Sequence, residues 1–243
     1  MTVKKNKFYF VAIIALVVFL VQPKVWHGLR DYFTKIDFET QLGLKSDVES
    51  NRSNSQLLEL DLKDKKQIEV AKHSGFTQTE LEKSKYSWIK FSGVTVTGKL
   101  KEVNLVVTPK SLNNDKNSEK ELKDIRPLGW HDGQKELVKI PIVSKGLINF
   151  TLDKNRVFTG TKQTAETLNQ VMSKVYESVL TSGQPARVRV TPIYKIVSQI
   201  PSGLIVESKG ISTNPLDFKV YVINQQKGYR LNYLTGTLKM EEN

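Results

Sequence analysis

Histidine is the side chain best suited to proton transfer near neutral pH, and this sequence contains three. His27 follows an apolar run at the N-terminus, His73 lies in a turn of Lys, Ser and Gly, and His131 ends the tripeptide Gly-Trp-His. The 243 residues include no cysteine, which excludes disulfides, thiolate zinc sites and cysteine nucleophiles. An acid–base or metal site would therefore depend on a histidine together with carboxylates or amides.

His131 is the one histidine with neighbours suited to metal chemistry. With Asp132 and Asp153 it would offer one nitrogen and two carboxylates to a divalent ion. Nothing in the spacing makes these three side chains converge, and Asp132-Gly133 is equally typical of a tight turn. No histidine is left to serve a nucleophilic triad. We therefore predict no catalytic residue, no metal ligand and no cofactor, with His131 as a weak alternative that would use Mg²⁺.

The charge balance points to a polyanionic partner. Lys and Arg number 37 against 25 Asp and Glu, which gives a formal net charge of +12 and a pI near 9.6. Such an excess favours nucleic acid, anionic lipid or wall polymers. A basic surface with no partner is the alternative.

The N-terminus has the order of an export signal. Lys4, Lys5 and Lys7 precede an uninterrupted apolar run from Phe8 to Val21, with no small-residue cleavage site after it. This predicts an uncleaved signal anchor over residues 1–23, with the N-terminus in the cytoplasm, residues 8–21 in the cell membrane and everything after residue 24 outside. Secretion after signal cleavage is the alternative.

Residues 24–63, rich in charge, Asn and Ser, predict an extracytoplasmic stalk, and residues 64–243 predict one α+β domain. Apolar residues recur at three- and four-residue steps from Ala165 to Leu180, which predicts a long helix with one buried face, ended by Gly183. A polar run, residues 111–124, predicts a mobile loop. The other expected elements are a strand at 65–70, a helix at 77–83, paired strands within 88–107, and strands at 187–194, 204–211, 218–224 and 229–234.

Six segments together resemble the DNA/RNA non-specific endonucleases of Gram-positive bacteria, of the DNA-entry nuclease and streptodornase type. The matching segments are Pro-Leu-Gly-Trp-His (127–131), Phe-Thr-Gly-Thr (158–161), Arg-Val-Arg-Val-Thr-Pro-Ile-Tyr (187–194), Gly-Leu-Ile-Val-Glu-Ser-Lys (203–209), Phe-Lys-Val-Tyr-Val-Ile-Asn (218–224) and Gly-Tyr-Arg-Leu-Asn-Tyr-Leu-Thr-Gly (228–236). They follow the family's order and cover residues 64–238. The resemblance implies a ββα-metal nuclease-like domain with an antiparallel sheet and one long buried helix, preceded by the N-terminal membrane helix.

The resemblance also implies that the cutting residues are missing. The family's motif, which ends in a histidine base, matches Ser144, Lys145, Gly146 and Leu147, so a leucine stands where the base belongs. A lost general base lowers a rate by about 10²–10⁴. Arg156 occupies the position of the metal-binding Asn, and Ala165 that of a further polar Asn. An arginine repels Mg²⁺.

We therefore expect a membrane-anchored pseudonuclease that binds DNA or RNA through phosphates. The predicted contacts are Lys145, Arg156, Lys162, Arg187 and Arg189, although the last two also fit the outward face of an alternating strand. Two alternatives stay open. One is an active metal-dependent endonuclease with a divergent site, and the other is a module that binds a protein partner at the cell surface through the old cleft.

Overall fold

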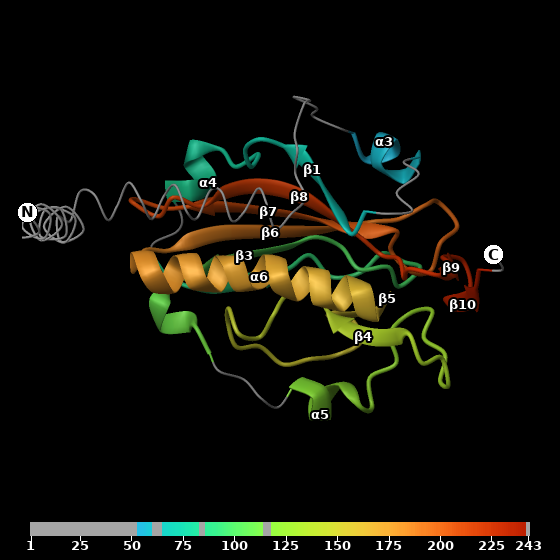
Figure 1. Cartoon of the computed structure of the whole chain (residues 1–243). Helices are drawn as coiled ribbons and strands as arrows, with labels where there is room; N and C mark the ends of the chain where they lie inside the picture. Colours follow the sequence, from blue (N-terminus) through green and yellow to red (C-terminus); the bar gives the residue numbers. More distant parts are fainter. Residues whose placement is uncertain (1–52, 60–64, 83–85, 114–117, 242–243) are drawn as a thin grey trace, which may run out of the picture. The chain divides into compact units, whose positions relative to one another are not determined.

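A six-stranded antiparallel sheet is the largest element of the computed structural model, which describes residues 53–59, 65–82, 86–113 and 118–241 (Figure 1). The strands, in spatial order, are β1 (Gln67–Ala71), β8 (Asp217–Ile223), β7 (Gly203–Gly210), β6 (Ala186–Ile193), β3 (Val103–Val107) and β2 (Trp88–Phe91). All neighbours pair antiparallel. The α+β class with an antiparallel sheet is thereby confirmed.

The long helix α6 (Lys162–Ser182) runs along one face of this sheet, as predicted from its apolar period (Figure 1). The Thr161 side chain accepts a hydrogen bond from the backbone N–H of Thr164 at 3.1 Å and so caps the helix. Gly183 ends it in a left-handed conformation, φ 66°, and donates its N–H to the Val179 carbonyl. The cap lets the helix begin three residues before the periodic apolar stripe.

Two further strands, β4 (Leu137–Pro141) and β5 (Val157–Thr161), pair antiparallel and lead directly into α6. This gives the two strands and a helix that the family resemblance implies. Every residue of β5 is buried. A side chain at Gly160 would lie 2.4 Å from Ile140 Cδ1, so glycine is needed where the two strands touch. Neither strand was predicted, because both are short and their apolar residues are interrupted.

The remaining helices and strands of the described fold are short. They are α3 (Asn54–Glu59), α4 (Gln78–Glu82), the 3₁₀ turn η1 (Pro109–Ser111), α5 (Ser118–Leu122) and the hairpin β9 (Tyr229–Asn232) with β10 (Thr237–Met240). Leu57 of α3 is buried against Ile68, Val70 and Tyr221, so the packed core draws on residues before position 64. The polar run 111–124, predicted as a loop, contains α5.

The predicted signal anchor and most of the predicted stalk lie outside the described residues. Within the described ranges, no helix has both the length and the apolar content that a membrane crossing requires.

A lysine-lined cavity as the candidate functional site

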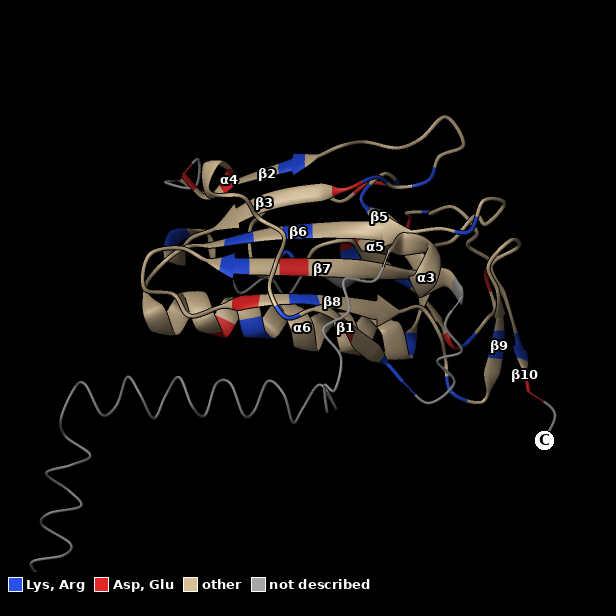
Figure 2. Ribbon diagram, turned by 90° about the horizontal axis from the view of Figure 1, so that it is seen from above, with Lys and Arg blue, Asp and Glu red and all other residues tan. Residues whose placement is uncertain are grey.

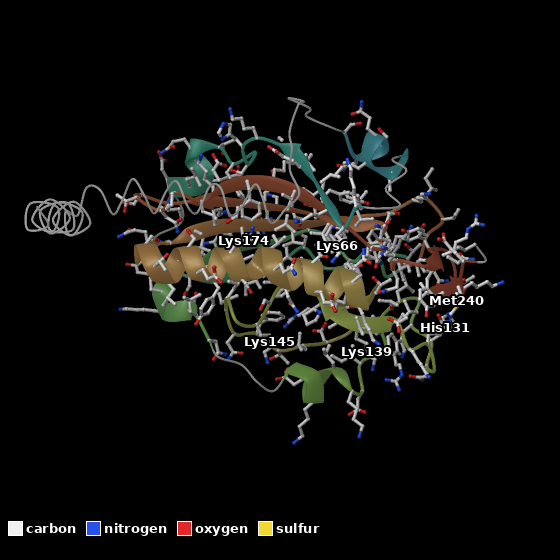
Figure 3. All side chains as sticks on the ribbon, viewed as in Figure 1. Lys66, His131, Lys139, Lys145, Lys174 and Met240 are labelled. Carbon is white, nitrogen blue, oxygen red and sulfur yellow. The ribbon has the colours of Figure 1, made fainter. Side chains whose placement is uncertain are left out.

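A cavity of about 620 Å³ lies beside the first half of α6. Its walls come from α6, from β4 and from the residues that follow α5, and Figure 3 shows Lys139 and Lys145 in this space. The charged residues that line it are Lys123, Lys139, Lys145, Lys162 and Glu166. Four cations and one carboxylate make this an electropositive cavity.

Asn224, at the end of β8, fixes the start of α6 and thereby one wall of the cavity. Its Oδ1 accepts hydrogen bonds from the Thr161 N–H at 3.2 Å and from the Thr164 hydroxyl at 3.1 Å. Its Nδ2 donates to the carbonyls of Thr159 and Pro201. Asn224 is fully buried, so all its polar atoms need such partners. The asparagine that ends one of the resembling segments is therefore a structural clamp.

Lys139 presents an ammonium group with no carboxylate partner among the described residues. Its Nζ donates to the carbonyls of Leu122 at 2.9 Å and Lys123 at 2.7 Å, and it lies 5.0 Å from the centre of the Trp130 ring. Burial lowers the pKa of Lys139, and the nearby charge of Arg126 lowers it further, whereas the charges of Asp132 and Asp124 partly oppose this shift. The carbonyls and the ring orient this cation, and no carboxylate of the described residues forms an ion pair with it.

The other lysines differ in how far they are neutralised. Lys145 is 7% exposed, and its Nζ lies 2.6 Å from Glu121 Oε1. Lys162, the first residue of α6, is half exposed and lies 3.4 Å from Glu136 Oε1. Lys145 is thus held in a close buried pair, whereas Lys162 has a longer contact that a stronger anion can replace.

The degenerate motif forms part of the same wall but offers no base. Ser144 and Lys145 line the cavity, and Leu147 is 1% exposed, with its side chain in the core. Ala165 lines the cavity where the resemblance implies a polar residue. The described residues bring no three His, Asp or Glu side chains together in a way that would hold a metal ion. Lysines around an alanine do not fit a divalent cation.

The alternative site at His131 is not assembled. The His131 Nε2 lies 2.6 Å from the Thr235 carbonyl of the β9–β10 turn, and Figure 3 shows His131 near Met240 of β10. Asp132 accepts from the Trp130 Nε1 at 2.9 Å. Asp153 pairs with Arg156 at 3.3 Å. Each candidate ligand has a separate structural partner.

Arg156 is not among the residues that line the cavity. Its guanidinium lies 4.7 Å from the centre of the Phe91 ring and donates to the Thr151 carbonyl at 2.6 Å. Together with the Asp153 contact, these bonds fix Arg156 to the loop before β5. We therefore do not retain it as a cavity contact.

Arg187 and Arg189 point to the opposite face of the sheet, below α4. Arg187 is buried, with its guanidinium 4.4 Å from the Trp88 ring centre, and it donates to the Leu105 carbonyl and to Asn104. Burial lowers the pKa of Arg187. Arg189 contacts Glu80 and lies 3.3 Å from Glu207. We predicted that these two arginines contact phosphate, but both are held by contacts within the domain and have structural roles.

Sequence reasoning missed Lys123, Lys139 and Trp130 as lining residues. Lys123 lay in the run predicted to be a loop, and Lys139 lies in a strand that was not predicted. The sequence indicated Trp130 only as part of the Gly-Trp-His segment of the family resemblance. The available signal was the lysine in the middle of Leu-Val-Lys-Ile-Pro, a charge inside an otherwise apolar segment.

No protein-family model and no curated protein matches the sequence. Solved structures do match the fold. NucA from Streptococcus agalactiae, with a magnesium ion bound, superposes with a TM-score of 0.61 at 18% identity, over 71% of this chain and 86% of that one. The Sda1 nuclease, with a bound zinc ion, gives 0.53 at 16% identity, over 63% and 82%. The described domain therefore has the fold of the DNA-entry type of non-specific nuclease.

Proposed function

We propose that this chain is a membrane-anchored, extracytoplasmic protein that binds DNA or RNA in the lysine-lined cavity without cutting it. The observation that carries the proposal is the set of four lysines around one cavity beside α6. Lysine ammonium groups contact phosphate oxygens without reading base sequence. The partner is therefore the nucleic-acid backbone.

Two cations of the cavity are available to phosphate. Lys139 is oriented by carbonyls and a tryptophan ring, and Lys162 has a half-exposed ion pair with Glu136 at 3.4 Å that a phosphate can replace. A phosphate that enters the cavity would meet both. Lys145 keeps its partner Glu121 and shapes the wall.

The absence of cleavage rests on the residues at the positions of the family's cutting groups. A buried leucine accepts no proton, and the alanine on α6 provides no oxygen to a metal ion. The membrane anchor rests on the sequence alone, on the basic residues and the apolar run before position 24.

The test uses the full chain in detergent with labelled DNA and RNA, with and without Mg²⁺. Retardation and cleavage are both scored across a salt series. If the two available lysines displace counterions, affinity should fall roughly twelvefold between about 50 and 200 mM salt. The double variant Lys139→Ala with Lys162→Ala should lose most of the retardation. Its charge-matched control, Lys90→Ala with Lys154→Ala, removes two exposed lysines outside the cavity and should bind normally.

Three outcomes separate the readings. Intact substrate with salt-sensitive retardation supports the proposal. Metal-dependent cleavage that His131→Ala abolishes would instead establish an active nuclease. Neither retardation nor cleavage would favour a protein-binding module on this fold.

A further inference from the structure

Two tight turns at one end of the sheet carry apolar side chains in their central positions. The β2–β3 connection ends in the turn Thr95 to Gly98, in which the Gly98 N–H donates to the Thr95 carbonyl at 2.9 Å. The β6–β7 connection contains the turn Lys195 to Ser198, closed by the Ser198 N–H and the Lys195 carbonyl at 3.1 Å. β2 and β6 both pair antiparallel with β3, so both turns lie at the same end (Figure 2).

The residues in the middle of these turns are of the wrong type for ordinary turns. Val96 has a relative exposure of 108%, Ile196 of 95% and Val197 of 70%. Turns favour Gly, Asn, Asp, Ser and Pro, and β-branched residues gain nothing there when their side chains pack against no other part of the chain. A cluster of exposed large apolar residues indicates a surface that is covered by another phase or molecule.

Lys99 ties the two turns into one surface. Its Nζ donates to the Ile196 carbonyl at 2.7 Å and lies 5.4 Å from the centre of the Tyr194 ring. The Tyr194 hydroxyl in turn accepts from the Leu100 N–H at 3.2 Å. The β6–β7 loop is held from its other side as well, because the N–H groups of Gln199 and Ile200 both donate to the Tyr233 carbonyl. The apolar tips are thus presented on fixed loops.

The charged side chains within the two loops are all lysines. Residues 92–101 and 194–200 contain Lys99, Lys101 and Lys195 and no Asp or Glu. Apolar tips ringed by lysines match the surface of an anionic bilayer, in which the acyl region accepts the side chains and the headgroups attract the lysines. A bilayer also accepts two separate convex turns without a matching socket, which a folded protein would have to provide.

We propose that the turns 95–98 and 195–198, which together we call the apolar tips, insert into the surface of an anionic lipid bilayer. This docking is independent of the cavity and of nucleic-acid binding. It would orient the domain with this end of the sheet on the membrane, in addition to any anchor at the N-terminus.

The absence of native cysteines makes the test direct. Val96→Cys and Ile196→Cys are each labelled with an environment-sensitive fluorophore in the full chain, which is reconstituted into phosphatidylglycerol-containing or pure phosphatidylcholine vesicles. The control is Leu180→Cys, an exposed apolar position in the last turn of α6, at the opposite end of the sheet (Figure 1). The full chain includes the predicted N-terminal anchor, which could attach the protein to vesicles by itself. The experiment therefore measures insertion at each probe and not the amount of protein bound to vesicles.

We expect a blue shift and quenching by spin-labelled lipid at positions 96 and 196 on anionic vesicles, and neither at position 180. Adding Lys101→Gln and Lys195→Gln should reduce both signals. Probes at 96 and 196 that stay water-exposed on anionic vesicles would overturn the proposal. A blue shift that grows with protein concentration in detergent, without vesicles, would overturn it in favour of self-association. Far-ultraviolet circular dichroism of each variant checks that the fold is retained.

Discussion

The two faces of the central sheet differ in how many carboxylates accompany their basic residues. On the face below α4, four cations, Arg187, Arg189, Lys209 and Lys219, lie among four carboxylates, Glu80, Glu102, Glu207 and Asp217. Figure 2 shows blue bands on β6, next to blue and red bands on β7 and β8. On the α6 face, four lysines and Glu166 line the cavity, and only Lys145 and Lys162 pair with a carboxylate among the described residues, Glu121 and Glu136. On the first face, cations that are balanced by carboxylates and covered by aromatic rings stabilise the fold. On the second face, lysines in excess over carboxylates can bind a ligand in the cavity.

The largest effect should come from the balanced face. Arg187→Ala removes two hydrogen bonds and the packing against Trp88 and Phe76, so we expect a loss of about 3 kcal/mol in the free energy of unfolding. Urea unfolding measures it. Arg230→Ala, at an exposed arginine of β9, is the control and should change stability by no more than about 0.5 kcal/mol. If the two variants were equally stable, the structural role of Arg187 would be wrong.

A smaller loss is expected at Glu207, which connects several strands of that face. Its carboxylate lies 3.3 Å from Arg189 and from Lys219, and it accepts from the Gly75 N–H at 3.0 Å. Glu207→Ala leaves these donors with fewer partners, so we expect about 2 kcal/mol of destabilisation with no change in nucleic-acid affinity. Unfolding and retardation are measured on the same preparation. A parallel loss of binding at a temperature where the variant is folded would show that the two faces are coupled.

On the cavity face, a substitution should weaken nucleic-acid binding and leave stability almost unchanged. Lys162→Gln removes one half-exposed charge, so stability should change by less than about 0.5 kcal/mol. The slope of log affinity against log salt should shrink by about 0.9 for DNA duplexes. Titration at several salt concentrations gives this slope, with Lys154→Gln as the charge-matched control. An unchanged slope would remove Lys162 from the binding surface.

The smallest effect concerns acid pH and the balanced face. Burial alone would raise the pKa of Asp217, but hydrogen bonds from Lys209, Ser74 and His73 outweigh it and place the pKa below its usual value. A carboxyl with a lowered pKa in the folded state adds stability above the pKa of the unfolded chain, about 3.9, and loses it as pH falls through the folded value. Asp217→Asn should therefore lose stability at neutral pH and show a weaker decline in acid. Urea midpoints between about pH 7 and 3 test this, and a parallel decline in both proteins would contradict it.

The sequence predicted most of the large elements because they rest on local patterns. The apolar period of α6 and the alternation of β6, β7 and β8 placed these elements within a few residues of their observed bounds. β4 and β5 were missed because both are short and their pairing brings together residues that are not neighbours in the sequence, such as Gly160 and Ile140. β10 was also missed, although it pairs with the preceding strand β9.

The candidate site was predictable only in part, for a related reason. Lys145 and Lys162 were found because they flank segments that resemble the nuclease family, and both line the cavity. For Arg187 and Arg189 the sequence left phosphate contact and the outward face of a strand open, because a strand pattern gives alternation but does not say what covers each face. That assignment needed the positions of Phe76 and Trp88, which come from other strands and loops.

The β9–β10 hairpin near the C-terminus packs closely against the Gly-Trp-His segment, which carries one of the residues that line the cavity. A side chain at Gly236 would lie 1.9 Å from the Gly129 carbonyl, so the β9–β10 turn fits against the Gly-Trp-His segment only because position 236 lacks one. Leu238 adds a hydrogen bond from its N–H to Gln134. Trp130, which lines the cavity, packs against the same core cluster as Tyr233 and Leu238 of this hairpin. Because a domain folds as a unit, the cavity acquires its finished shape only when this hairpin near the C-terminus has joined the fold.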